Sequence, residues 1–279
     1  MIQLIDLNKF FEDRHVLQNI NANFYPGVAN LVIGASGGGK SVLVKTMVGL
    51  ESPSSGQVLF EEKDYHNLEY EQQQELRREI GMLFQGTALF DSLTVEQNVE
   101  FPLLMFSNMS KEERMERVNL CLSKVNLVNA NKKSPSEISG GMKKRVGIAR
   151  AIALPIKYLF CDEPNSGLDP LTSIVIDELI AEITQEFNMC TVVITHDMNS
   201  VIEIGDKIVE RVGRLRHGRG AMAAQIVADD AEFLLQVRHE PGEGGARGAD
   251  AMNEEEGSPS PSTATTATKC SAISWNCSR

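Results

Sequence analysis

The chain has 279 residues, an ordinary globular composition and a formal net charge of −11. This acidity argues against a nucleic-acid partner, because general nucleic-acid binders usually carry a broad basic face. Neither a membrane span of roughly 18 apolar residues nor a signal peptide is visible, which predicts a cytosolic chain or one that a partner holds at a membrane.

The N-terminal part predicts a strand-rich beginning. Short apolar or alternating runs mark four segments: Ile2–Leu7, Val16–Phe24, Val28–Ile33 and Val58–Phe60. The third run leads into four glycines within six residues, and apolar residues at helical spacing resume from Val42 to Val48. The glycines therefore lie on a strand-to-helix turn, although taken alone they are also compatible with a flexible surface loop.

This turn matches the phosphate-binding pattern G-x-x-x-x-G-K-[ST] through Gly34, Gly39, Lys40 and Ser41. Backbone N–H groups of such a loop wrap a polyphosphate, because glycines allow the close approach and the following helix directs its positive end at the anion. Lys40 would reach the terminal phosphates, and the Ser41 hydroxyl would bind Mg²⁺. The turn therefore predicts a nucleoside triphosphate with Mg²⁺ as the ligand.

The middle of the chain changes from strand to helix. Glu69–Glu79 are mostly good helix formers, Ile80–Gln85 predicts a strand, and helical spacing runs from Thr94 to about Arg150. Three more elements follow: a strand at Ile156–Cys161, a helix at Leu171–Phe187 and a strand at Thr191–Thr195. Strands that alternate with helices imply an α/β fold with a mainly parallel sheet covered on both faces.

Two carboxylates follow the strand predicted at Ile156–Cys161. Asp162 can hold Mg²⁺ opposite Ser41, and Glu163 would then point at the γ-phosphate and polarise the attacking water. An Asp-Glu pair that ends a strand is most often a solvated turn, but this pair follows a phosphate-binding loop and an apolar strand. We therefore expect it to complete an ATPase site.

The stretch EISGGMKKR at Glu137–Arg145 resembles the signature motif of ATP-binding cassette (ABC) ATPases, usually LSGGQ. Four further matches keep the order of that family: Phe11 for the aromatic that stacks on adenine, Gln85 for the glutamine loop, Ser166–Pro170 for the D-loop and His196 for the switch histidine. The resemblance covers about residues 2–209. It implies an ABC ATPase domain at 1–210, a P-loop NTPase with a mainly parallel core sheet, an antiparallel β subdomain and a helical subdomain at about 86–155.

The resemblance also assigns roles to residues. Catalysis would fall to Glu163, His196 and Lys40, and Mg²⁺ would be held by Ser41, Gln85 and Asp162. ATP binding is implied for a larger set: Phe11, Gly34, Ala35, Ser36, Gly37, Gly38, Gly39, Lys40, Ser41, Gln85, Ser139, Gly140, Gly141 and Asp169. Outside this ordered series, a lone histidine such as His196 would more often be a capping or solvated residue.

One ABC domain carries half of each composite site, and this chain has one set of motifs. The resemblance therefore implies a homodimer with two ATP molecules between the copies. The signature residues of one copy would face the phosphates held by Lys40 of the other, and Asp169 would link the copies.

A polytopic membrane permease is also implied as a partner. Its coupling helix would enter a groove formed by about Gln85 to Leu104. Within this range, Phe90, Leu93 and Phe101 would either contact the permease or pack inside the helical subdomain, and the sequence leaves both open.

Local features narrow the resemblance. Met142 stands where most family members carry Gln, KSVLVK continues the phosphate loop, and LFDSLTVEQNVEFPL follows the glutamine loop. Together with SGGMKKRVGIARAIAL, these resemble the ATPases of Mla/Mce-type lipid transporters. That implies phospholipid movement across the bacterial envelope, an Mce-type lipid-binding partner reached through the permease, and a peripheral position on the cytoplasmic face of the inner membrane.

Two alternatives stay open: the ATPase of another ABC importer, such as one for amino acids, and a soluble non-transport ABC ATPase of the iron–sulfur assembly type. The resemblance stops near residue 210. Residues 211–239 form an atypical segment rich in Arg, Gly and Ala, and residues 240–279 have the composition of a disordered tail. This region is either a divergent accessory tail or the product of a shifted reading frame, which the other two frames of the gene would reveal.

Overall fold

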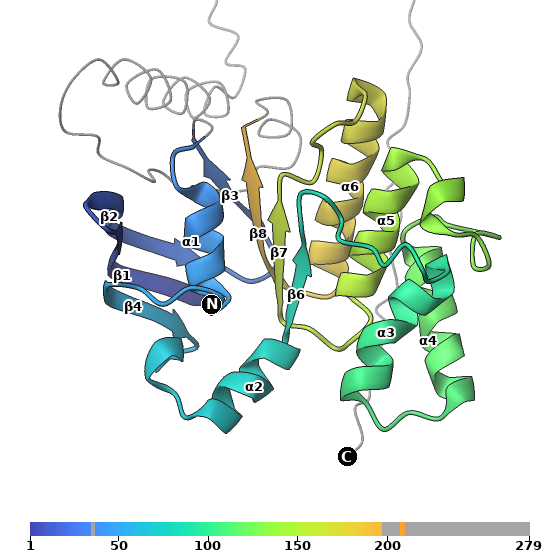
Figure 1. Cartoon of the computed structure of the whole chain (residues 1–279), viewed down its shortest axis with the longest axis horizontal. Coiled ribbons are helices and arrows are strands. Elements are labelled where there is room, and N and C mark those ends of the chain that lie inside the picture. The colour runs from blue at the N-terminus through green and yellow to red at the C-terminus, as the bar shows by residue number, and fades with distance from the viewer. Residues whose placement is uncertain (35–36, 197–206, 210–279) are drawn as a thin grey trace, which may run out of the picture. The chain divides into compact units, whose positions relative to one another are not determined.

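A computed structural model of the chain describes residues 1–34, 37–196 and 207–209. The predictions for the atypical segment at 211–239, for the tail at 240–279 and for the loop residues Ala35 and Ser36 lie outside the described residues. The described strands form two sheets with helices packed against them (Figure 1).

The smaller sheet is antiparallel. Its strands span Ile2–Phe11 (β1), Arg14–Phe24 (β2), Ser55–Phe60 (β4) and Lys63–Asp64 (β5). They lie in the order β2-β1-β4-β5, and β1 pairs with β2 as a hairpin. The predicted antiparallel β subdomain is present, and its hairpin extends beyond the apolar runs because polar residues near the turn also pair.

The larger sheet is parallel. Its strands span Ala29–Ile33 (β3), Ile80–Leu83 (β6), Tyr158–Asp162 (β7), Cys190–Thr195 (β8) and Lys207–Val209 (β9). The order is β6-β7-β8-β3-β9. Every residue of β3 and β8 is buried, as expected for strands covered on both faces. The predicted α/β fold with a mainly parallel core sheet is confirmed.

The described α-helices span Lys40–Met47 (α1), Tyr70–Arg78 (α2), Val95–Phe106 (α3), Lys111–Lys124 (α4), Gly140–Ala151 (α5) and Pro170–Glu186 (α6). Short 3₁₀ turns lie at Tyr65–Asn67 and Pro135–Glu137. Figure 1 shows α1 on one side of the parallel sheet and α5 and α6 on the other. None of these described helices is long and apolar enough to cross a membrane.

Alternate residues of the central strands enter two different cores. Leu31 and Ile33 of β3 belong to the core that α5 and α6 cover, whereas Val32 belongs to the core between α1 and the antiparallel sheet. This follows from the period of two in a strand, which points successive side chains to opposite faces. Both faces therefore fix the carboxyl end of β3, where the glycine-rich turn begins.

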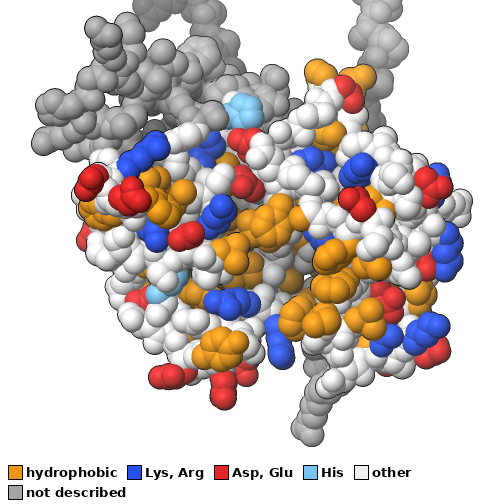
Figure 2. Space-filling view, in the orientation of Figure 1, with side chains coloured by type: hydrophobic (Ala, Val, Ile, Leu, Met, Phe, Trp, Pro, Cys, Tyr) orange, Lys and Arg blue, Asp and Glu red, His pale blue; other side chains and the backbone are white. Residues whose placement is uncertain are grey.

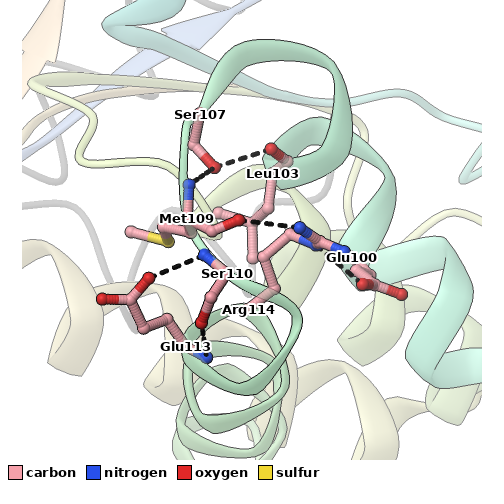
Figure 3. A network of polar contacts seen from close by, with 7 residues as sticks. All are labelled: Glu100, Leu103, Ser107, Met109, Ser110, Glu113 and Arg114. Atoms are coloured by element: carbon pink, nitrogen blue, oxygen red, sulfur yellow. Dashed lines mark hydrogen bonds and ion pairs between the residues drawn. The ribbon is translucent and has the colours of Figure 1, made fainter.

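The helical stretch predicted from Thr94 to about Arg150 contains three helices, α3, α4 and α5. Figure 3 shows the polar contacts at the turn between α3 and α4. Arg114 donates to the Glu100 carboxylate at 2.9 Å and to the Met109 carbonyl at 2.8 Å. Ser110 begins α4 as its N-cap and exchanges hydrogen bonds with Glu113. Apolar periodicity alone does not reveal that the helical stretch is interrupted between α3 and α4, because the capping side chains determine where α4 begins.

Two predicted strands were too long by two residues. β6 ends at Leu83 and not at Gln85, and β7 begins at Tyr158 and not at Ile156. The apolar run continues beyond the end of β6 because Phe84, although apolar, starts a turn. In this turn the Thr87 N–H donates to the Phe84 carbonyl at 2.8 Å. Gln85 consequently lies in a loop beyond the end of the sheet.

Candidate functional site

The glycine-rich turn joins β3 to α1 and is closed by Lys40. Lys40 is only 5% exposed, and its Nζ donates to the Gly34 carbonyl at 2.6 Å. Burial lowers the pKa of Lys40, while the carboxylates of Glu163 and Asp162 act in the opposite direction. The ammonium therefore lies near both predicted carboxylates, at a place where it can bind an anion.

The turn has the backbone that a polyphosphate needs. Gly37 and Gly39 have φ angles of 77° and 95°, in the left-handed region that other residues rarely adopt. A Cβ on Gly39 would lie 3.1 Å from Val16, whereas one on Gly37 would meet no atom of the described residues within 4 Å. Packing against β2 thus requires a glycine at position 39, and no described residue crowds the turn at Gly37. The first turn of α1 carries no acidic residue, so its N–H groups can receive phosphate.

Ser41 and Asp162 come together from the start of α1 and the end of β7. The Ser41 Oγ lies 3.5 Å from Asp162 Oδ1. Burial raises the pKa of Asp162, and the hydrogen bond from Ser41 partly offsets this effect. A hydroxyl and a carboxylate are ligands that Mg²⁺ takes together with phosphate oxygens and water. The pair therefore fits Mg²⁺, and the described part of the chain holds no cluster of three His, Cys, Asp or Glu that would form a separate metal site.

The Glu163 carboxylate lies between two other predicted site residues. Gln85 Nε2 donates to Glu163 Oε2 at 2.7 Å, and His196 Nδ1 lies 3.1 Å from Glu163 Oε1. Gln85 Nε2 also lies 3.4 Å from the Ser166 hydroxyl. The loop after β6, the end of β7 and the end of β8 thus meet at one carboxylate.

The backbone of Glu163 is held in an uncommon conformation. Its φ of 47° lies in the left-handed region. Its N–H donates to the Ile194 carbonyl at 2.9 Å, and its carbonyl accepts from the Ser166 N–H at 3.1 Å. Such conformations persist only where the surroundings hold them, and they cluster at functional sites.

Phe11 lies on the face of the β1–β2 hairpin that meets the glycine-rich turn. Lys9 shares this face, because its Nζ lies 4.8 Å from the centre of the Phe11 ring. Lys9 pairs with Leu17, whose side chain would come within 3.4 Å of a Cβ on Gly39. The neighbouring Phe10 points to the opposite face. Phe11 is 41% exposed, so its ring is accessible to a nucleotide base.

The predicted signature residues Ser139, Gly140 and Gly141 form the start of α5. The Ser139 Oγ accepts the Met142 N–H at 3.3 Å, so Ser139 is the N-cap of α5. A Cβ on Gly141 would lie 2.5 Å from Thr172 of α6, so this helix packs closely on α6. Because α5 and α1 belong to cores on opposite faces of the parallel sheet, the signature lies across the sheet from the helix of Lys40.

Asp169 caps α6. One carboxylate oxygen accepts the Thr172 N–H at 3.0 Å and the other accepts the Thr172 hydroxyl at 2.6 Å. These hydrogen bonds lower the pKa of Asp169. Both oxygens therefore have partners within the same chain, and the predicted roles of Asp169 in ATP binding and in linking two copies stay predictions.

A family model described as ABC transporter matches residues 17–166, which is more than half of the chain. The chain belongs to the ABC transporter family. The match spans the phosphate loop, the glutamine loop, the signature and the two carboxylates that end β7. The chain is accordingly an ABC ATPase, a P-loop enzyme with the site described above.

Curated relatives of this ABC ATPase carry the name methionine import ATP-binding protein MetN. The protein from Clostridium tetani is 36% identical over 247 residues, which are 88% of this chain and 77% of that protein. The protein from Corynebacterium jeikeium is 41% identical over 208 residues, which are 73% of this chain and 56% of that protein. The chain thus spans little more than half the length of the Corynebacterium protein.

Solved structures of ABC ATPases share the fold. One is a dimeric post-hydrolysis structure of an ATP-binding cassette bound to ADP and phosphate, which matches with a TM-score of 0.66 and 31% identity. The match covers 78% of this chain and all of the solved chain. CbiO1 from Clostridium perfringens, part of an ABC transporter complex, has a TM-score of 0.71 and 29% identity over 85% of this chain and 94% of that chain.

The names of these relatives bear on the predicted subfamily. They support an ATP-binding subunit of an ABC transporter, and they do not support the Mla/Mce features of the prediction. They fit the alternative of another ABC importer better.

Sequence reasoning missed two basic residues of this ABC ATPase. Lys144 is 4% exposed, and its Nζ donates to the Gln85 carbonyl at 2.6 Å. Arg150 donates to the carbonyls of Thr87 and Ala88. A signal for Lys144 was available, since it stands at helical spacing from the buried residues at 141 and 148 on the same stripe of α5.

Proposed function

We propose that the chain is the ATP-hydrolysing subunit of an ABC importer. It works with a membrane permease and lies peripherally on the cytoplasmic face of the inner membrane. The observation that carries this proposal is the Glu163 carboxylate, held between Gln85 and His196 next to the Lys40 ammonium. The curated relatives support the importer class through their names.

ATP binding uses the glycine-rich turn at Gly37 and the N-terminus of α1. The buried ammonium of Lys40 compensates phosphate charge at low dielectric, where an ion pair is stronger than in water. Phe11 offers its exposed ring to the adenine base. Ser41, Asp162 and the amide oxygen of Gln85 would hold Mg²⁺, which would supply positive charge to offset that of the phosphates.

Hydrolysis requires a water in line with the γ-phosphate. Glu163 orients this water and accepts its proton at a carboxylate oxygen, because a carboxylate accepts further hydrogen bonds beyond those from Gln85 and His196. His196 contacts the γ-phosphate from the end of β8. The carboxylate is already fixed before the reaction, so the step needs little reorganisation.

The site is completed by a second copy of the chain. Ser139, Gly140 and Gly141 begin a helix on the far side of the sheet from α1, so we propose that they reach the γ-phosphate held by the partner copy. One related cassette is a dimer in two solved structures, which supports this arrangement.

The permease docks on apolar side chains around α3. Phe90 and Phe101 pack with ring centres 4.8 Å apart yet remain exposed. They therefore combine the two roles that the sequence left open, packing inside the helical subdomain and contact with the permease. Leu104, Met105 and Phe106 are each more than half exposed. Figure 2 shows hydrophobic side chains gathered over this part of the molecule. A patch of this kind marks a protein interface.

The imported solute is proposed to be methionine or a similar amino acid, from the names of the relatives. A second candidate is the lipid-transport function with an Mce-type partner. It is favoured by Met142, which replaces a polar amide beside Ser139, and by the segment that follows Gln85.

The test is an affinity capture from detergent-solubilised native membranes with the Glu163→Gln variant and ATP. Recovery of a permease together with an amino-acid-binding subunit supports the importer, and a permease with an Mce-type subunit supports the second candidate. Recovery of soluble proteins alone contradicts both and favours the non-transport alternative. The Lys40→Met variant serves as the matched control, because it should not form the ATP-dependent complex.

A further inference from the structure

Two basic side chains of α5 hold the main chain of the glutamine loop, which we define as residues 85–88. Lys144 Nζ donates to the Gln85 carbonyl at 2.6 Å. Arg150 donates through Nη2 to the Thr87 carbonyl and through Nη1 to the Ala88 carbonyl, both at 2.7 Å. Six residues of helix, about 9 Å, separate the two side chains, so they contact the loop at both ends.

The part of the loop that Arg150 holds is strained. Thr87 and Ala88 have φ angles of 62° and 48°, both in the left-handed region and both at residues with a Cβ. Two consecutive residues seldom adopt this conformation unless surrounding groups stabilise it. The guanidinium binds the carbonyls of these two residues at short distances, which is the stabilising contact that the conformation needs.

Lys144 connects the loop to the site. Its Nζ also lies 3.3 Å from the Glu163 carbonyl. One ammonium therefore binds the main chains of Gln85 and Glu163, whose side chains meet at 2.7 Å. Because Lys144 is 4% exposed, water does not replace these carbonyls as its partners.

The helix also approaches the loop closely at Gly147. A Cβ at this position would lie 2.6 Å from Leu83 Cδ1 and 3.8 Å from the Thr87 Cβ. Beyond the loop, the buried Asn98 side chain of α3 accepts the Phe90 N–H at 2.8 Å and donates to the Phe90 carbonyl at 3.1 Å. The loop is thus fixed to α5, and the segment that follows it is fixed to α3.

We propose that Lys144 and Arg150 are positioning residues that clamp the glutamine loop to α5, the helix that begins at the signature. A displacement of α5, or of the exposed side chains at Phe90 and Phe101, then changes the contact between Gln85 and Glu163. The inference rests on the proposed function for its catalytic consequence. Its structural part, the clamp itself, is independent of that function. Signature and glutamine loop then move together when a permease or a second copy contacts either one.

The test compares Lys144→Met and Arg150→Met with a matched control, Arg117→Met. Arg117 donates to the Ile152 and Ala153 carbonyls just beyond α5, so its removal breaks the same kind of contact on this helix but away from the loop. Hydrogen–deuterium exchange of the amides at 84–90 is the first measurement. We expect both loop variants to exchange at least tenfold faster there than wild type and the control. Equal exchange in all four proteins would overturn the clamp.

Steady-state kinetics of ATP hydrolysis gives the second measurement. In Lys144→Met we expect kcat to fall at least tenfold with KM within threefold of wild type, whereas Arg117→Met should keep kcat within threefold. Lys144→Gln keeps N–H donors for the two carbonyls, so its kcat should recover most of the loss seen in Lys144→Met. It also replaces Lys144→Met in the experiment if that variant does not fold. A loss equal in Lys144→Met and Arg117→Met, or no rescue, overturns the positioning role. Lack of hydrolysis by wild type would contradict the proposed function and leave the exchange experiment to decide the clamp.

Discussion

Glu163 has a hydrogen-bonding partner at its N–H, at its carbonyl and at both carboxylate oxygens. The sequence places a carboxylate after the strand, but the partners at its main chain are Ile194 at the end of β8, Lys144 of α5 and Ser166. Fixing a reacting group in this way favours positional and electrostatic catalysis.

The first prediction concerns the Glu163→Gln variant. An amide of the same size keeps the contact geometry but cannot accept a proton, so kcat for ATP hydrolysis should fall by about 10²-fold or more. Affinity for ATP should change less than threefold, because the carboxylate does not bind the phosphates directly. Phosphate release and titration with a fluorescent ATP analogue measure the two quantities. Glu182→Gln, at an exposed position of α6, is the control, and a kcat within threefold of wild type in Glu163→Gln would contradict the assignment.

The second prediction concerns pH. Burial lowers the pKa of His66, whose Nε2 lies 3.0 Å from the Thr46 carbonyl and therefore carries the hydrogen. Since the folded state has the lower pKa, the unfolded chain binds the proton more readily. The stability that His66 contributes is present above the unfolded pKa of about 6.5 and decreases as the pH falls through it.

Urea unfolding of wild type and His66→Gln at pH 7.5 and pH 5.5 tests this sign. The free energy of unfolding of wild type should decrease more between the two pH values than that of the variant, in which this titration is absent. An equal decrease in both proteins would show that His66 does not contribute to the pH dependence.

At the level of elements, apolar periodicity predicted the strands and helices of the core, because β3, β7 and β8 are buried on both faces and α6 has one apolar stripe. It also predicted the phosphate turn, since a strand, a glycine pattern and a helix follow one another directly. It did not predict the three-helix division of residues 94–150 or the clamp on the glutamine loop. Both depend on polar side chains that bind main-chain groups, and the hydrophobic period does not show which main-chain groups they bind.

The third prediction tests the start of α4. Ser110→Ala removes the N-cap and should lower the free energy of unfolding by about 1 kcal/mol. Ser123 lies in the same helix and donates to the Leu120 carbonyl without capping it, so Ser123→Ala should change stability by less than about 0.5 kcal/mol. Urea titration measures both, and equal effects would contradict the capping role.

At the level of the whole molecule, the site lies where the carboxyl ends of β3, β7 and β8 meet. Gly34, Asp162 and His196 each end or follow one of these strands, and parallel strands bring such ends to one edge of the sheet. The signature begins a helix on the other face and lies apart from α1. One copy therefore keeps the phosphate loop and the signature apart, as the proposed site shared between two copies requires.

The fourth prediction follows from this separation and uses two inactive variants. Lys40→Met removes the phosphate-binding ammonium, and Ser139→Asp keeps an N-cap for α5 but repels phosphate. Each variant alone should lose about 10²-fold of the ATPase activity, because every site in its homodimer lacks one half. In a mixed dimer, however, the intact loop of the Ser139→Asp copy faces the intact signature of the Lys40→Met copy.

An equal mixture should therefore recover about a quarter of the wild-type activity, since half of the dimers are mixed and each of these has one complete site of two. Phosphate release by the mixture, against each variant at the same total concentration, measures the recovery. A double variant carrying both changes in one chain, mixed with wild type in equal amounts, is the matched control. It leaves no complete site in the mixed dimer and also predicts about a quarter, from wild-type homodimers alone. A mixture of the two single variants that is no more active than either component would exclude sites shared between two copies.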